Sequence, residues 1–394
     1  KCTDTLTAVW ITVQCPSRVP VGKYHQTIKI EGSKHFTIQL DYNVHHTTIP
    51  LKSSIPITVG VENRCMTEGL NDKEADKERQ RWVDFVLSYR MTPVFGTQIT
   101  PERWQYEHSF SPWAWNDKRS IRLLNDRRYS CYMLPFFTLS ENELASLLCN
   151  IQKKGKLKES LFYIWDEPAY MEDYEQIKRK VNIIRKYASD ARILTTFFCG
   201  PRNGPRKGDL YAVFDYLKHH IHVATISLAP CKGNEEEVQH IRYKVPEGID
   251  WWSYVCWQPG GNEPNFLLQM KGIQQRAIMW RTWKNGSQGF LYWNCNIYHK
   301  RNPFTYITDM PHGDGILIYP GDILGCKGPI ASARLERWRD GAEEMELLRL
   351  VEKNYSKEKA DTLLNIVYSS PLSFIEKAPT PLFTVGKSAI LVHL

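Results

Sequence analysis

Apolar and polar residues alternate along the first fifty positions of the chain. The alternating runs lie at 8–13, 26–30 and 36–40, and turn-forming Gly and Pro residues separate them. Period-two alternation predicts strands that bury one face and leave the other in water. We therefore predict that residues 1–52 form a small β-sandwich module, truncated at its N-terminal end.

Beyond residue 52, short apolar runs alternate with amphipathic stretches of helical period. The strand-like runs lie at 55–62, 92–97, 130–136, 161–166, 192–198, 223–229, 251–257 and 289–294. The clearest helical stretches lie at 72–90, 140–153, 171–188, 208–219, 234–243 and 264–284. One of these starts at Ser140, and Glu143 three residues later completes a capping-box pattern. Eight strands alternating with helices predict an α/β fold, a (β/α)8 TIM barrel.

A doubly wound open sheet is the competing architecture. It normally carries a Gly-rich phosphate turn after its first strand, and residues 60–63 form no such turn. After the eighth strand comes a Gly- and Pro-rich stretch, followed by a helical pattern at 332–353 that we assign to the last barrel helix. The barrel is thus expected over 53–355. Residues 356–394 are expected to form a short C-terminal extension with a helix at 356–368.

Charge and cysteine usage narrow the functional class. The net charge of +8 is spread along the chain, and the short basic runs fall on predicted helix faces, so nucleic acid is not an expected partner. The ten cysteines occur singly, which argues against a metal site, and we expect no metal or organic cofactor. No apolar run is long enough to span a membrane. Sequons at Asn285 and Asn354 would permit N-glycosylation in a secreted protein, and we expect a secreted or extracytoplasmic location.

Two adjacent carboxylates mark the strongest candidate site. The fourth strand runs through five apolar residues into Asp166 and Glu167, and Pro168 then ends it. Catalytic groups of this barrel lie at the C-terminal ends of strands, and buried acids are costly unless they are paired or used. The Trp and Tyr residues, 13 and 20 in number, suit the apolar faces of sugar rings. The sequence therefore predicts a glycoside hydrolase.

The position of the second acid restricts the mechanism. An ordinary retaining glycosidase draws its two carboxylates from different strands, and the seventh strand, at 251–257, contains no acid. Substrate-assisted cleavage needs no protein nucleophile, because the 2-acetamido oxygen of the sugar attacks the anomeric carbon. Glu167 would then act as general acid and base, and Asp166 would orient the acetamido N–H. Coupling between neighbouring acids should push their pKa values apart.

Several stretches of the chain resemble glycoside hydrolase family 123, the β-N-acetylgalactosaminidases. They lie at 9–13, 20–24, 163–168, 252–259, 289–293, 313–315, 319–321, 334–336 and 339–341. The resemblance covers nearly the whole chain, although the longer N-terminal region usual in the family is missing. It implies a β-sandwich followed by a (β/α)8 barrel, and a catalytic Asp-Glu pair that maps onto Asp166 and Glu167.

Further site residues are expected from their strand positions. Tyr254 on the seventh strand is the candidate for binding the acetamido carbonyl, and Trp252 or Trp257 would stack on the sugar, depending on which strand face points inward. The remaining candidates lie at the end of the eighth strand and in the loop before the third: Trp293, Asn294, Asn296 and Trp115.

Charged residues near the last helix have a different expected role. Glu336 and Arg339, like Arg337 and Asp340, stand at i and i+3 with opposite charge, which is typical of surface ion pairs on a helix. Asp314, between two glycines, suits either a turn or a ligand contact.

The sequence favours an exo-acting, retaining β-N-acetylgalactosaminidase acting on glycans with a terminal 2-acetamido sugar. Two alternatives stay open. One is a hexosaminidase with another sugar preference, such as N-acetylglucosamine. The other is a catalytically silent carbohydrate-binding protein on the same scaffold, against which the intact pair of Asp166 and Glu167 argues.

Overall fold

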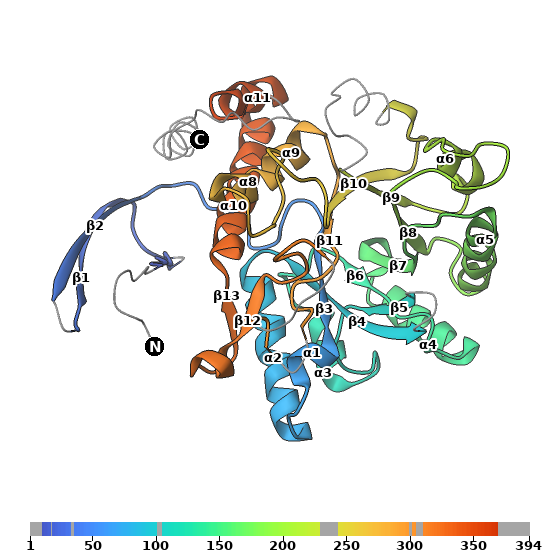
Figure 1. The fold of residues 1–394 in the computed structure, drawn as a ribbon, viewed down its shortest axis with the longest axis horizontal. Helices are drawn as coiled ribbons and strands as arrows, with labels where there is room; N and C mark the ends of the chain where they lie inside the picture. Colours follow the sequence, from blue (N-terminus) through green and yellow to red (C-terminus); the bar gives the residue numbers. More distant parts are fainter. Residues whose placement is uncertain are drawn as a thin grey trace.

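The structure is a computed structural model, and it describes residues 10–16, 18–32, 35–100, 105–228, 243–298, 302–304 and 310–368. Its main feature is a sheet of nine strands in the order β5-β4-β3-β11-β10-β9-β8-β7-β6 (Figure 1). In chain order the strands are β3 (Ile57–Glu62), β4 (Thr92–Thr100), β5 (Gln105–Ser109), β6 (Tyr132–Met133), β7 (Ser160–Trp165), β8 (Arg192–Phe197), β9 (Val223–Ser227), β10 (Asp250–Val255) and β11 (Phe290–Tyr292).

The sheet curls until its two edges nearly meet. All of its pairings are parallel except the one between β4 and β5. At the seam, the backbone N–H of Phe110 donates to the carbonyl of Met133 at 2.7 Å. The hydroxyls of Thr92 and Ser130 also meet there, at 2.8 Å. The chain is therefore an α/β protein with a nearly closed, mostly parallel sheet, consistent with the predicted barrel.

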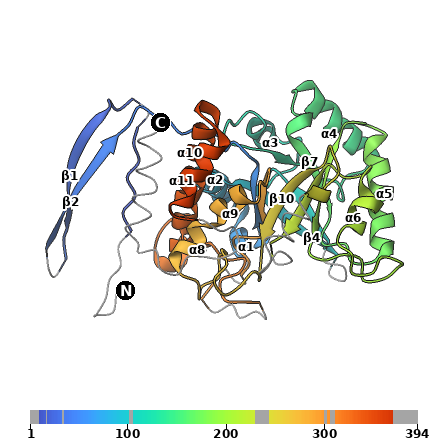
Figure 2. The same ribbon diagram turned by 90° about the horizontal axis from the view of Figure 1, so that it is seen from above.

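Helices and two further small sheets surround this sheet (Figures 1 and 2). The α-helices are α1 (Asn63–Thr67), α2 (Asp72–Ser88), α3 (Lys118–Leu123), α4 (Glu141–Lys153), α5 (Met171–Arg185), α6 (Ala212–Leu217), α8 (Gly272–Arg276), α9 (Ile278–Lys284), α10 (Ala333–Asn354) and α11 (Lys357–Asn365). Short 3-10 helices span Leu157–Glu159 and Gly321–Leu324, and a hairpin pairs β12 (Ile318–Pro320) with β13 (Pro329–Ala331). The capping box predicted at Ser140 is present at the start of α4. Among the described residues, no helix is long and apolar enough to cross a membrane.

Two predicted helices differ from the structure or fall outside it. The helix expected at 264–284 begins only at Gly272 and is divided into α8 and α9. Asn265 explains the late start, because its amide donates to the carbonyls of Cys256 and Pro259 and holds this stretch as a loop. Apart from its last residue, the helix expected at 234–243 lies outside the described residues.

The N-terminal part is a hairpin of β1 (Gly22–Ile30) and β2 (Phe36–Val44), paired antiparallel with Ile28 opposite Ile38. It stands to one side of the barrel, beyond α10 (Figures 1 and 2). Residues 10–13 form no strand, contrary to the alternation, and their side chains are exposed. The full sandwich over 1–52 and the domain boundaries stay predictions. At the other end α11 packs on α10, and residues 369–394 lie outside the described part.

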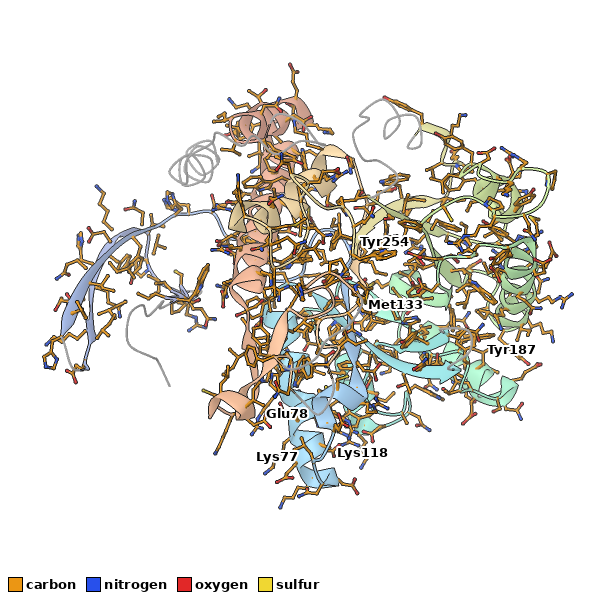
Figure 3. All side chains as sticks on the ribbon, viewed as in Figure 1. Lys77, Glu78, Lys118, Met133, Tyr187 and Tyr254 are labelled. Carbon is orange, nitrogen blue, oxygen red and sulfur yellow. The ribbon has the colours of Figure 1, made fainter. Side chains whose placement is uncertain are left out.

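Side chains of the barrel strands divide between an outer and an inner core. Phe162 and Ile164 of β7 face the helices, whereas Leu161 and Tyr163 belong to a separate cluster inside the barrel. We call this inner group the interior cluster; it comprises Val94, Cys131, Met133, Leu161, Tyr163, Leu194, Val223, Trp252, Tyr254, Cys256 and Leu291. Figure 3 shows two of its members, Met133 and Tyr254, near the centre of the barrel.

The charged residues at the start of α10 are less exposed than the sequence predicted. Glu336 and Arg339 do form an ion pair, at 2.5 Å, but Arg334 and Glu336 are buried. Arg334 donates to the carbonyls of Phe266 and Gly313 at 2.7 and 2.6 Å, so it fixes loops rather than a surface pair. The pair predicted between Glu336 and Arg339 is therefore present, but Glu336 is buried rather than on the surface, and its Oε1 also accepts from Tyr89 Oη at 2.6 Å.

The buried polar and sulfur-containing residues include several cysteines and one sequon asparagine. Cys65, Cys131, Cys256 and Cys295 are buried free thiols. Asn285, the acceptor of the first sequon, is fully buried at the end of α9. In the folded protein this asparagine is not accessible for glycosylation.

Candidate active site

The acidic pair lies where β7 ends at the mouth of the barrel. A register shift between Tyr163 and Trp165 interrupts the pairing of β7 with β8. As a result both Ile164 and Trp165 pack on the outer core, and the alternation resumes with Asp166 facing the pocket inside the mouth. A bulge of this kind re-aims the side chains that follow it. Without it, regular alternation would have turned Asp166 outward.

Asp166 is held by two hydroxyl groups. Its Oδ1 accepts a hydrogen bond from Tyr163 Oη at 2.7 Å and another from Thr196 Oγ1 at 2.7 Å. The ring of Tyr163 in turn stacks on His108, with centroids 4.1 Å apart. Burial lowers the pKa of His108 to about 3, so its imidazole is neutral at physiological pH. These two donors fix the direction in which the Asp166 carboxylate points.

Glu167 adopts an uncommon backbone conformation. Its φ of 42° lies in the left-handed region, and its N–H donates to Thr196 Oγ1 at 3.0 Å. A residue other than glycine rarely occupies this region, and such strain is concentrated at functional sites. The geometry lets two consecutive acids reach the same mouth, where a regular strand would point them to opposite faces.

The environment of Glu167 suits a proton donor. Loss of hydration at the crowded strand ends, and then the negative charge of Asp166, raise the pKa of Glu167 to about 7. The hydroxyl of Tyr254 donates to Glu167 Oε1, which works in the opposite direction. A carboxyl with a pKa near the working pH can both give and take a proton during a reaction.

A pocket opens at the barrel mouth beside Asp166. It encloses about 610 Å³, counting the solvent at its opening. Its floor is apolar, formed by interior-cluster residues such as Met133 and Leu291, and its rim is polar. The polar and aromatic residues of the rim include Glu62, Tyr106, His108, Asp166, Trp293 and Asn294.

Of the predicted substrate-binding residues, Trp293 and Asn294 line this pocket, and Tyr254 contacts the acidic pair. Trp293 is oriented by Asp314, whose Oδ1 accepts from the indole N–H at 2.9 Å and from Tyr292 Oη at 3.0 Å. Burial raises the pKa of Asp314 to about 6. Asp314, which suited either a turn or a ligand contact, thus holds an aromatic wall of the pocket.

The other predicted residues take different places. Trp252 points into the barrel but lies two residues before Tyr254 on β10, where it is 1% exposed and packs over Gly289. It therefore offers no ring face to a sugar in this structure. Trp257, past the strand end, is 50% exposed. Asn296 is fully buried and binds the backbone of Glu62, and Trp115 packs against the outer core.

Sequence reasoning missed Glu62, Tyr163 and Thr196. Glu62 follows the buried strand at 57–61 as Asp166 follows its own strand, so the same signal was present in the sequence. Tyr163 and Thr196 carried no comparable signal, because their contacts to Asp166 depend on the pairing of β7 with β8. Among the described residues, no cluster of three or more His, Cys, Asp or Glu is arranged to hold a metal ion.

Comparisons with known proteins place this site in context. The model of the glycoside hydrolase 123 catalytic domain matches residues 77–351. A family 123 glycoside hydrolase from Clostridium perfringens, solved in a study of glycolipid glycan hydrolysis, aligns with a TM-score of 0.62 and 14% identity, over 96% of this chain and 76% of that one. A β-D-glucuronidase from Dictyoglomus thermophilum aligns with a TM-score of 0.39 and 11% identity, over 80% and 57% of the two chains.

No curated protein matches the chain. The Clostridium structure supports the fold, and the family model covers both acids and most of the pocket rim. The chain therefore belongs to glycoside hydrolase family 123.

Proposed function

We propose that the protein is an exo-acting, retaining β-N-acetylgalactosaminidase that works by substrate-assisted catalysis on a (β/α)8 barrel. The observation that carries this proposal is the division of labour between two adjacent acids. Asp166 is fixed by two hydroxyl donors, whereas the pKa of Glu167 is raised to about 7. Family membership supports glycoside hydrolysis, and the site supplies the reason for the 2-acetamido sugar.

In the first step, Glu167 gives its proton to the glycosidic oxygen as the bond to the anomeric carbon breaks. The carbonyl oxygen of the 2-acetamido group attacks the same carbon and closes an oxazolinium ring. Asp166 accepts the acetamido N–H and stabilises the positive charge that develops on that group. Its oxygen is already oriented by Tyr163 and Thr196, so little reorganisation is needed at the moment of reaction.

In the second step, the ionised Glu167 takes a proton from water, which opens the oxazolinium ring at the anomeric carbon. The sugar leaves with its original configuration, because two inversions have occurred. The Tyr254 hydroxyl has a single proton, which it donates to Glu167 in this structure. We assign this hydroxyl to stabilising the ionised Glu167 before a sugar binds and to the acetamido carbonyl once a sugar is bound. Trp293 and Asn294 would then wall the sugar ring, and Trp257 would cover it from the loop after β10.

A comparison of three aryl glycosides tests the proposal. The enzyme should hydrolyse the β-N-acetylgalactosaminide, and the β-N-acetylglucosaminide should reveal the preference at C4. The plain β-galactoside lacks the internal nucleophile and should stay intact. Equal turnover of the plain galactoside would rule out the substrate-assisted mechanism. If none of the three is cleaved, the silent carbohydrate-binding alternative gains support, and binding of the free sugars would be measured next.

A further inference from the structure

A third carboxylate shares the pocket with Asp166. Glu62 is the last residue of β3, the first strand of the barrel, and it lines the pocket at the barrel mouth. The side chain is partly buried, and burial raises the pKa of its carboxyl. A carboxylate that gives up hydration without a cationic partner carries a free-energy cost unless something else binds it.

The protein supplies only part of what this carboxylate can bind. Glu62 Oε1 accepts the N–H of Arg64 at 3.3 Å. The charge of Arg64 lowers the pKa of Glu62 by less than burial raises it. Within the part of the chain that the structure describes, no Lys or Arg side chain forms an ion pair with the carboxylate, and only its Oε1 accepts a hydrogen bond. An ionised carboxylate offers about four acceptor sites, so several stay open toward the pocket.

The backbone of Glu62 is fixed firmly enough to act in recognition. The amide of Asn296 accepts the N–H of Glu62 at 2.8 Å and donates to its carbonyl at 3.1 Å. Gly60 lets the end of β11 approach closely, since a Cβ there would lie 1.8 Å from the carbonyl oxygen of Trp293. The two hydrogen bonds to the Glu62 backbone explain why Asn296 is buried. Asn296 was expected to touch the substrate, but in the structure it positions Glu62.

Glu62 and Asp166 stand on different sides of the barrel mouth. On one path around the sheet, β8, β9, β10 and β11 separate β7 from β3. A sugar in the pocket therefore has Asp166 on one side and Glu62 on another. In a pyranose ring, the edge that carries O4 and O6 lies away from the substituent at C2.

We infer that Glu62 binds the hydroxyl groups on the C4–C6 edge of the sugar and selects the axial O4 of a galacto-configured substrate. This inference rests on the proposed function, which puts the 2-acetamido group at Asp166. An axial O4 and O6 lie close enough together to donate to one carboxylate, whereas an equatorial O4 turns toward O3. Asn294, on the same rim, uses its Oδ1 to accept the N–H of Asn296, and its Nδ2 can donate to one of the remaining hydroxyls.

The test combines variants of the enzyme with changes in the sugar. Wild type, Glu62→Gln and the surface control Glu358→Gln are assayed on the aryl β-N-acetylgalactosaminide, its 4-deoxy analogue and the N-acetylglucosaminide. Glu62→Gln should lower kcat/KM on the galactosaminide by about 10- to 100-fold, as expected for a charge-assisted hydrogen bond. It should cause little further loss on the 4-deoxy sugar, and the preference over the glucosaminide should shrink by a similar factor.

Three results would overturn the inference. The first is that Glu62→Gln leaves all three rates unchanged. The second is an equal loss of about 1000-fold or more on all three sugars, which would assign Glu62 to the chemistry instead. The third is an equal but smaller loss of kcat/KM on all three sugars, which would show that Glu62 has a structural role only. Thermal melting of Glu62→Gln against Glu358→Gln separates these outcomes from misfolding. Failure of the proposed function is distinguishable, because wild type itself would then cleave the plain β-galactoside equally well or cleave none of the aryl glycosides.

Discussion

Strand β10 contributes to two regions of the barrel that differ in kind. Trp252 and Tyr254 both belong to the interior cluster, but Trp252 is 1% exposed, whereas Tyr254, two residues further on, donates its hydroxyl to Glu167. Strand β7 repeats the pattern, with Leu161 inside and Asp166 at the mouth. The interior is filled by shape and by apolar contact. The mouth instead gathers acids with shifted pKa values and a residue at positive φ.

The difference shows how one strand can serve stability and chemistry together. The interior cluster excludes water and forms the floor on which the mouth is built. This low-dielectric floor strengthens electrostatic interactions directly above it. Substitutions in the two regions should therefore separate: those at the mouth change turnover and leave folding intact, and those inside change stability.

The largest effect is expected for the acidic pair. Glu167→Gln should reduce kcat on a substrate with a poor leaving group by about 100- to 10,000-fold, and much less on an activated aryl glycoside that leaves without a proton. Asp166→Asn should suppress turnover on both. Steady-state kinetics on matched substrates measures this. Equal losses on both leaving groups would remove Glu167 from the acid role, and a fully active Asp166→Asn would end the substrate-assisted mechanism.

The interior should respond in the opposite way. Trp252→Ala should lower the free energy of unfolding by about 3–5 kcal/mol, because it leaves a cavity beneath the mouth. The control is Trp257→Ala, at a tryptophan that is 50% exposed, which should change stability by no more than about 0.5 kcal/mol. Urea unfolding followed by circular dichroism gives both values. Similar losses in the two variants would mean that the enclosed position of Trp252 is wrong.

The dependence of kcat/KM on pH tests Tyr254, which belongs to the interior cluster and reaches the barrel mouth with its hydroxyl. Glu167 must be protonated to act as acid, so kcat/KM should fall as the pH rises through about 7. The Tyr254 hydroxyl stabilises the ionised form of Glu167, so Tyr254→Phe should raise the pKa of Glu167 and move this fall to higher pH. A lower rate with an unmoved profile would limit Tyr254 to the acetamido group.

The smallest effect is expected at Asp314, behind the wall of the pocket. Asp314→Asn weakens the acceptor that holds Trp293 and should raise KM by about two- to tenfold with kcat nearly unchanged. The folded protein favours the protonated carboxyl, whose pKa is raised to about 6. The wild type should therefore lose stability as the pH rises from about 4 to about 6, because Asp314 has to ionise in its buried site. The Asp314→Asn variant should lose less stability over the same range. Parallel melting curves across this range would contradict that assignment.

How far the sequence could predict the site is clearest along β7 and β10. The apolar run that ends in two acids predicted strand β7 and its end at Asp166 and Glu167. This worked because burial and the end of a strand depend on residues that are adjacent in the sequence. The same reasoning made Trp252 a stacking residue, although its depth in the barrel depends on neighbouring strands. Asn296 was likewise assigned to the substrate, yet its partner Glu62 is distant in sequence.

The sequence by itself determined most of the strands and helices, the two adjacent acids and the resemblance to family 123. The elements follow from periodicity, whereas the acids and the resemblance follow from residues that are neighbours along the chain. Only the tertiary structure decided which hydroxyls hold Asp166, which acid has its pKa raised, and that Glu62 shares the pocket. Hydrogen bonds, dehydration and charge coupling act over a few ångströms between residues far apart in sequence, and closing the sheet is what brings those residues together.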